Sequence, residues 1–234
     1  MTKFTSVIFI IFLLIACNNS TSEKGKVEIT KKEKTSETEI PSQLSTAQTI
    51  AYKHGFEHWQ EVEELKFTFN VDRSNRHFER SFIWKPKTND VVYMNATDTV
   101  AYNRSQLDSI STLADKAFIN DKYWLLAPFQ LVWDEGTSFS EQENVVAPIS
   151  KDTLNMLTIV YGSEGGYTPG DAYDFYYDAA FNIKEWVFRD GNGPNADMTN
   201  TWEDYKEFNG LKIATMHRDT TSDFKLYFTN ISVK

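Results

Sequence analysis

The sequence predicts an α+β fold, in which a large curved antiparallel sheet carries two or three helices on one face. Two stretches, 65–103 and 154–233, alternate apolar and polar residues with the period of two that half-buried strands require. The segment 105–119 between them repeats its apolar residues at helical spacing instead. The pair Asn209-Gly210 adds a strong two-residue hairpin signal. We therefore expect nine to eleven short strands in antiparallel meanders, with a helix inserted between them.

The folded part begins with a predicted helix whose N-terminus is marked by a capping box. Ser45 is followed three residues later by Gln48, so each side chain can bond the backbone N–H of the other residue. Apolar residues then recur on one helical face as far as Gly55, which is placed to end the helix. A second short helical turn is expected over 56–63.

Two meanders of strands are predicted from the alternating segments. The first comprises 65–71, 78–84, 90–95 and 99–103. The second follows a loop rich in Gly, Ser and Glu, and comprises 154–161, 172–177, 183–189, 202–208, 211–218 and 224–233. Residues 154–161 are apolar on both faces, which predicts a strand covered on both sides.

The meanders are separated by an apolar stretch, DKYWLLAPFQLVW, at residues 121–133. Proline lacks an amide hydrogen and clashes with the preceding helical turn, so Pro128 is expected to end any helix begun at Asn120. We predict at most two helical turns over 121–127 and extended chain over 129–133. The run is too short to span a membrane. We expect it to cross the mouth of the sheet.

Charge and cysteine content disfavour several classes of function. The formal net charge is −9, and the loss of Lys3 with a signal peptide leaves −10. Such an acidic chain is a poor partner for nucleic acid or anionic lipid head groups. Cys17 is the only cysteine, so the folded part has no disulfide, no thiolate metal ligand and no cysteine nucleophile. The folded part suits one domain, and we expect a monomer.

The N-terminus resembles the signal peptide of bacterial lipoproteins. Lys3 precedes a short apolar run, and Leu14-Ile15-Ala16-Cys17 is similar to a lipobox. The resemblance implies that residues 1–16 are removed and that Cys17 is acylated, which would anchor the chain in a membrane. The alternative is an ordinary secretory peptide that is cut elsewhere.

The same resemblance bears on location and domain limits. Asn18 is not the Asp of the inner-membrane retention signal, which favours the outer membrane of the cell envelope. Residues 17–45 are rich in Ser, Thr, Lys and Glu, and cannot bury enough apolar surface to fold. We therefore predict a disordered tether over 17–45 and a folded domain over 46–234.

The order of elements resembles the LolA-like superfamily of bacterial lipoprotein carriers and sorting proteins. The matching motifs are AYKHGFEHW at 51–59, YWLLAPF at 123–129 and WEDYKEFNGLKI at 202–213. The resemblance implies an unclosed half β-barrel whose concave face holds the helices and binds acyl chains. The carriers are soluble shuttles, whereas an acylated Cys17 would tether this chain. The resemblance therefore implies an anchored lipoprotein or receptor that binds an acyl chain, another hydrophobic ligand or a lipoprotein.

Aromatic rows on the predicted strands and the apolar stretch suggest a ligand cavity, because apolar ligand sites combine aromatic walls with a few polar groups. The expected lid and cavity residues are Trp84, Phe118, Tyr123, Trp124, Leu126, Phe129, Trp133, Phe175, Tyr177, Trp186 and Phe188. Arg80 and His217 lie in otherwise apolar rows and are the expected polar anchors. The alternative is a filled core in which these polar residues are satisfied, as in an envelope scaffold.

We predict no catalytic residue, metal site or cofactor. His54 and His58 have the spacing of two metal ligands on a helix, but Gly55 stands where a metalloprotease needs a glutamate. Asp171 and Asp174 are the carboxylate pair that a competing function, an anchored glycan or lipid hydrolase, would use.

Overall fold

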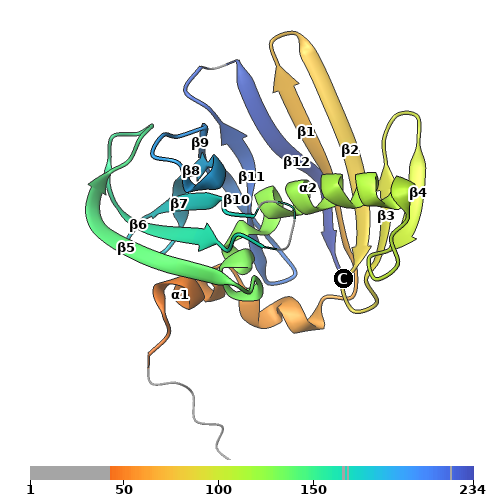
Figure 1. Cartoon of the computed structure of the whole chain (residues 1–234), viewed down its shortest axis with the longest axis horizontal. Coiled ribbons are helices and arrows are strands. Elements are labelled where there is room, and N and C mark those ends of the chain that lie inside the picture. Colours follow the sequence, from red (N-terminus) through yellow and green to blue (C-terminus); the bar gives the residue numbers. More distant parts are fainter. Residues whose placement is uncertain (1–42, 165–166, 168, 222) are drawn as a thin grey trace, which may run out of the picture. The chain divides into compact units, whose positions relative to one another are not determined.

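The computed structural model describes residues 43–164, 167, 169–221 and 223–234. The predicted signal peptide, Cys17 and the predicted tether as far as residue 42 lie outside the described residues. The described part forms two antiparallel sheets that do not close into a barrel, together with a short helix, a long helix and two 3-10 turns (Figure 1). The predicted α+β class with an unclosed antiparallel architecture is confirmed. Within these ranges, no helix combines the length and the apolar character needed to cross a bilayer.

The first helix forms where the capping box predicts it. Helix α1 covers Thr46–Lys53, and Ser45 is its N-cap. The Ser45 hydroxyl accepts from the Gln48 amide at 3.2 Å, while the Gln48 side chain accepts from the Ser45 amide at 2.9 Å. Gly55 follows with a φ of +90° and leads into the 3-10 turn η1, Phe56–Glu61. These predictions are confirmed.

The larger sheet has seven strands and brings the two ends of the domain together. Its order is β10 (Glu203–Phe208), β11 (Leu211–Arg218), β12 (Phe224–Val233), β1 (Leu65–Arg73), β2 (Arg76–Lys85), β3 (Asp90–Met94) and β4 (Thr99–Asn103). Asn209 and Gly210 both have positive φ in the β10–β11 turn, as the hairpin signal requires. The predicted strands of the first meander and those over 211–218 and 224–233 are therefore confirmed, each within about two residues at its ends.

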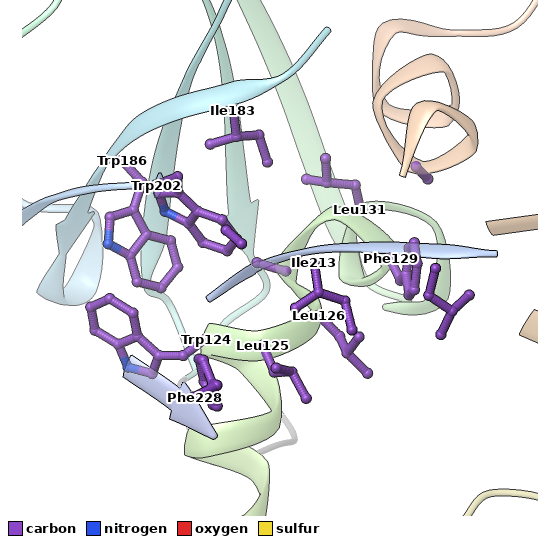
Figure 2. Close-up of a cluster of buried hydrophobic side chains, with 14 of the residues drawn as sticks. Trp124, Leu125, Leu126, Phe129, Leu131, Ile183, Trp186, Trp202, Ile213 and Phe228 are labelled. Atoms are coloured by element: carbon purple, nitrogen blue, oxygen red, sulfur yellow. The ribbon is translucent and has the colours of Figure 1, made fainter. Parts of the chain in front are cut away.

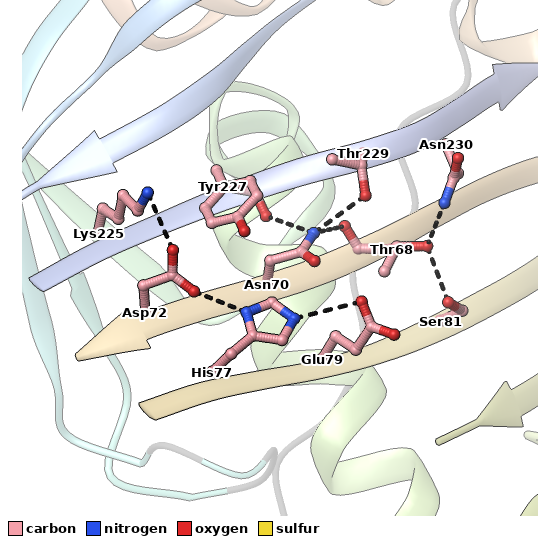
Figure 3. A network of polar contacts seen from close by, with 10 residues as sticks. All are labelled: Thr68, Asn70, Asp72, His77, Glu79, Ser81, Lys225, Tyr227, Thr229 and Asn230. Atoms are coloured by element: carbon pink, nitrogen blue, oxygen red, sulfur yellow. Dashed lines mark hydrogen bonds and ion pairs between the residues drawn. The ribbon is translucent and has the colours of Figure 1, made fainter. Parts of the chain in front are cut away.

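The outer face of the larger sheet carries a polar network over β12, β1 and β2 (Figure 3). The Asn70 amide donates to the carbonyls of Thr68 and Tyr227 and to the Thr229 hydroxyl, each at 3.1 Å. Phe69, its neighbour on β1, is buried on the opposite face. The alternation of β1 thus separates a hydrogen-bonded outer face from an apolar inner face.

The smaller sheet contains a strand that the sequence did not predict. Its order is β5 (Thr137–Val146), β6 (Thr153–Tyr161), β7 (Ala172–Tyr177), β8 (Ile183–Arg189) and β9 (Met198–Thr201). The prediction of a loop before residue 154 was wrong, because β5 is an edge strand paired along β6. Nearly all of its residues are exposed, so β5 has no apolar alternation to reveal it.

The two sheets meet at Trp202, between β9 and β10. The sequence predicted one strand over 202–208, but β9 pairs with β8 and β10 pairs with β11, in different sheets. The Trp202 amide donates to the Lys184 carbonyl at 2.7 Å, and the indole is buried. The 3-10 turn η2, Asp190–Asn192, follows β8.

The long helix α2 spans Ser109–Trp133 and lies across the strands (Figure 1). The predicted end at Pro128 and the extended chain over 129–133 were both wrong. Leu126 has a φ of −125° and a ψ of 24°, so the helix bends there and then continues. A kink of this kind accommodates the proline ring and its missing hydrogen bond. Helical packing of the following residues outweighs that local cost, because 127–131 are all buried.

The core joins α2 to both sheets. Figure 2 shows Trp124, Leu125, Leu126, Phe129 and Leu131 of the helix beside residues of β8, β11 and β12. All five side chains are at most 7% exposed. The apolar stretch is therefore mainly a core segment on a bent helix, and its Tyr and Trp side chains line two cavities beside that helix.

Candidate functional site: two adjoining cavities on the long helix

An aromatic cavity of about 550 Å³ lies between α2 and the smaller sheet. Its walls are Lys116, Ile119, Asn120, Tyr123, Trp124, Tyr167, Tyr173, Trp186, Phe188 and Met198. Tyr123 stacks on Tyr173 with ring centroids 4.6 Å apart, and Trp124 meets the edge of Trp186 at 4.4 Å. This volume and aromatic lining are typical of small-molecule sites.

Strand register builds the sheet wall of the aromatic cavity. Tyr173 of β7 is paired with Phe188 of β8, and Phe175 is paired with Trp186. Paired residues on adjacent strands point to the same face, so one face of the two strands presents four aromatic rings.

A polar cavity of about 460 Å³ adjoins the aromatic cavity. It is lined by Arg104, Ile119, Lys122, Tyr123, Gln130, Trp133, Asp134, Glu135, Gly136, Tyr161, Gly162, Glu164 and Tyr167. Ile119, Tyr123 and Tyr167 line both cavities. The two cavities are therefore neighbouring spaces that share a wall.

Tyr123 links the two cavities to a hydrogen-bonded carboxylate. Its hydroxyl lies 3.0 Å from the hydroxyl of Tyr161, which donates to Asp134 at 2.7 Å. Burial raises the pKa of Asp134 above its ordinary value, although the hydrogen bond from Tyr161 and the positive charge of Lys122 oppose that shift. One wall of the polar cavity thus holds a partly desolvated carboxylate bound by a tyrosine hydroxyl.

The predicted ligand residues separate into two groups. Tyr123, Trp124, Trp186 and Phe188 line the aromatic cavity, and Trp133 lines the polar cavity together with Tyr123. The remaining predicted residues line neither of these two cavities and lie in the hydrophobic core: Trp84, Phe118, Leu126, Phe129, Phe175 and Tyr177. Whether any of them contacts a ligand stays a prediction.

The two expected polar anchors have partners within the protein. The Arg80 guanidinium binds both carboxylate oxygens of Asp121, at 2.6 Å each. His217 is fully buried, and its Nδ1 lies 3.0 Å from the Thr201 carbonyl oxygen. Burial lowers the pKa of His217 to about 3, so the imidazole is neutral at pH 7. Neither residue lines the aromatic cavity.

The two histidines considered as a metal pair serve the packing of α1 and η1. His54 is buried, and its Nδ1 lies 2.8 Å from the Ile50 carbonyl oxygen. The ring of His58 lies directly against Gly210. Among the described residues, no group of three or more His, Cys, Asp or Glu side chains could hold a metal ion.

The carboxylate pair of the hydrolase alternative is also held by internal contacts. Asp174 binds Arg189 through two contacts of 3.0 Å and accepts from the Thr158 hydroxyl at 2.7 Å. Asp171 accepts from the Gly191 amide at 2.9 Å, and burial raises its pKa. Neither carboxylate lines the aromatic or the polar cavity.

Sequence reasoning missed several residues that line the cavities. Tyr173 shares the alternating face of Phe175, so the same pattern could have found it. Lys122 and Gln130 are polar residues inside an otherwise apolar run, and their eight-residue spacing places them on one face of a helix. That signal depended on recognising the helix beyond Pro128. Tyr161 and Tyr167 come from separate segments that only the fold brings to α2.

Solved structures similar to this chain include the following two. A DUF1329 family protein from Desulfovibrio piger has a TM-score of 0.46 and 8% identity, covering 81% of this chain and 92% of that chain. A LolA superfamily protein from Nitrosomonas europaea has a TM-score of 0.43 and 12% identity, covering 82% and 94%. No protein-family model and no curated protein matches the sequence. The chain thus has a LolA superfamily protein and a DUF1329 family protein as structural neighbours, at low sequence identity.

Proposed function

We propose that this protein binds a hydrophobic small molecule in the aromatic cavity, as a lipoprotein of the cell envelope. The main support for the proposal is the aromatic cavity of about 550 Å³, whose walls include aromatic rings from α2, β7 and β8. A filled core would leave no such space, and aromatic walls favour an apolar ligand over water. The hydrolase alternative has less support, because its carboxylates are engaged elsewhere.

Binding is tested with N-phenyl-1-naphthylamine, a neutral hydrophobic dye whose fluorescence rises in apolar surroundings. Met198 lines the cavity and is 40% exposed, so Met198→Trp places an indole at the wall with little demand on the core. We expect at least a tenfold loss of dye affinity. Val146→Trp is the matched control, because Val146 is 64% exposed on β5 and lines neither cavity. Equal affinity in both variants, or no dye binding by the wild type, would contradict the proposal.

Anchoring at the outer membrane through an acylated Cys17 is the second part of the proposal, supported by the lipobox-like sequence. We expect the full chain made in a bacterial host to partition into the detergent phase of Triton X-114 and to fractionate with the outer membrane. Cys17→Ser should move it to the aqueous phase, because one acylated cysteine is the only lipid attachment proposed. Detergent-phase partition of both proteins would exclude Cys17 as the anchor.

A further inference from the structure

Lys122 is a buried cation that faces the polar cavity. It belongs to α2 and is 8% exposed, and it lies among the residues lining that space. Its Nζ lies 5.7 Å from the ring centre of Trp84 and 5.5 Å from that of Trp133. Lysine is rarely buried to this degree without a charged partner, because desolvating an ammonium group is costly.

Among the described residues, no carboxylate lies within the 4.0 Å of a salt bridge to Lys122. With the Gln130 amide oriented to satisfy its neighbours, its oxygen accepts from Nζ at 3.1 Å. The Gln130 nitrogen then donates to Asp134 at 2.8 and 3.2 Å. An ammonium group has three donors, so one amide oxygen leaves most of its bonding capacity for another acceptor.

The other charged groups of the polar cavity have hydrogen-bonding partners of their own or are exposed to solvent. Arg104 binds Asp115 at 2.8 Å. Asp134 receives hydrogen bonds from Tyr161 and from Gln130. Glu135 and Glu164 are exposed, so solvent and salt screen them. Within the part of the chain that the structure describes, the Lys122 ammonium therefore has no direct ion pair. The charge of Asp134 acts on it from beyond 4.0 Å, across the Gln130 amide that bonds both groups.

We propose that the ligand is an anionic amphiphile, whose apolar tail occupies the aromatic cavity and whose carboxylate or phosphate head group pairs with Lys122 in the polar cavity. The shared wall of Ile119, Tyr123 and Tyr167 places the two spaces side by side, as one elongated molecule requires. This inference rests on the proposed function and adds the chemical class of the ligand. A buried cation kept at a cost to stability is consistent with a role in binding.

The experiment compares three ligands that share one chain length: dodecanoate, dodecyl phosphate and 1-dodecanol. The two anions are used below their micellar concentrations and the alcohol below its solubility limit. Each displaces N-phenyl-1-naphthylamine from the full-length protein at pH 7. We expect one or both anions to bind at least tenfold more tightly than the alcohol. The preferred anion identifies a carboxylate or a phosphate head group.

The Lys122→Met variant tests the residue itself. We expect the advantage of the anion over the alcohol to fall below twofold, with alcohol affinity unchanged within twofold. Lys53→Met, which removes an exposed lysine of α1, should keep the full advantage. Lys122→Gln replaces the methionine variant if circular dichroism shows that the latter is unfolded.

The outcomes separate this inference from the proposed function. Equal wild-type affinity for anion and alcohol, or an anion preference that survives in the folded Lys122 variant, would overturn the head-group assignment alone. Failure of the dye and of all three ligands to bind the wild type would overturn the hydrophobic-ligand function as well.

Discussion

Arg80 of β2 and Asp121 of α2 form a two-pronged ion pair in which both N–O distances are 2.6 Å. Asp121 is fully buried, and the Arg80 side chain is 18% exposed. Burial raises the pKa of Asp121 to about 6, and the guanidinium limits this shift. The pair thus fixes the long helix to the larger sheet and keeps a buried carboxylate ionised at pH 7.

Removal of the arginine should destabilise the protein in a pH-dependent manner. Arg80→Met leaves Asp121 without its cation, and we expect a loss of about 3–5 kcal/mol in the free energy of unfolding at pH 8. Because the folded-state pKa then rises further above the unfolded value, stability is lost as pH increases through it. Urea unfolding of the variant and the wild type at pH 5 and pH 8 measures how the loss of stability depends on pH. Lys225→Met, which breaks an exposed pair with Asp72, is the control and should cost at most about 1 kcal/mol. An equal loss at both pH values would count against this interpretation.

Lys122 should reduce stability in the absence of ligand. Burial, followed by the charge of Arg104, lowers the pKa of Lys122 to about 8, below its ordinary 10.5. The charged form therefore costs the folded state up to about 3 kcal/mol below pH 8, and this cost disappears as pH rises to 10.5. Lys122→Met should raise the free energy of unfolding by about 1–3 kcal/mol at pH 7, since lost cation–π contacts offset part of the gain. A variant less stable than the wild type at pH 7 would show that these contacts outweigh desolvation.

Buried His217 should make the protein sensitive to acid. Its folded-state pKa is about 3, against 6.5 for the free side chain, so its contribution is present above pH 6.5 and is lost as pH falls toward 3. His217→Phe removes this titration and should reduce the loss of stability between pH 7 and pH 5 by about 2 kcal/mol. The measured quantity is the change in the free energy of unfolding between pH 7 and pH 5, from which any constant packing effect cancels.

His77 is the opposite case, because it is exposed and Asp72 raises its pKa. His77→Phe should therefore increase the acid sensitivity of the protein.

Gly55 should tolerate no side chain. A Cβ atom there would lie 1.9 Å from the Gly210 carbonyl oxygen, and its φ is +90°. Gly136 has a positive φ as well, but nothing lies within 4 Å of its Cβ position. We expect Gly136→Ala to cost about 1 kcal/mol from backbone conformation alone. Gly55→Ala should cost several times more, because the β10–β11 turn must move. Thermal unfolding of both variants measures the two costs. Equal costs would mean that the turn adapts freely.

Local signals in the sequence were enough to find most of the fold. The capping box at Ser45, the alternation of β1 and the Asn209-Gly210 turn each depend on a few neighbouring residues, and each is confirmed. The paired faces of β7 and β8 also follow from alternation. These features are predictable because backbone geometry and burial of one face act within a single element.

The features that were missed depend on distant parts of the chain. Pro128 is a helix breaker locally, yet burial of its neighbours in the core keeps α2 helical to Trp133. Exposed β5 is held by its hydrogen bonds to β6, which its own composition does not reveal. Lys122 becomes notable only when the bent helix brings it between Trp84 and Trp133. The sequence predicted a cavity lined by aromatic side chains. It did not indicate the polar cavity beside it.

The corner at Trp202 has a mechanical consequence. The indole is buried where the chain passes from one sheet to the other, and the Thr201 carbonyl and hydroxyl beside it are bonded by His217 and Arg218 of β11. A corner built from a bulky ring and hydrogen bonds is stiff, in contrast to one built from glycine. These contacts restrain the passage of the chain between the sheets, and we expect the angle between the sheets to change little when a ligand binds.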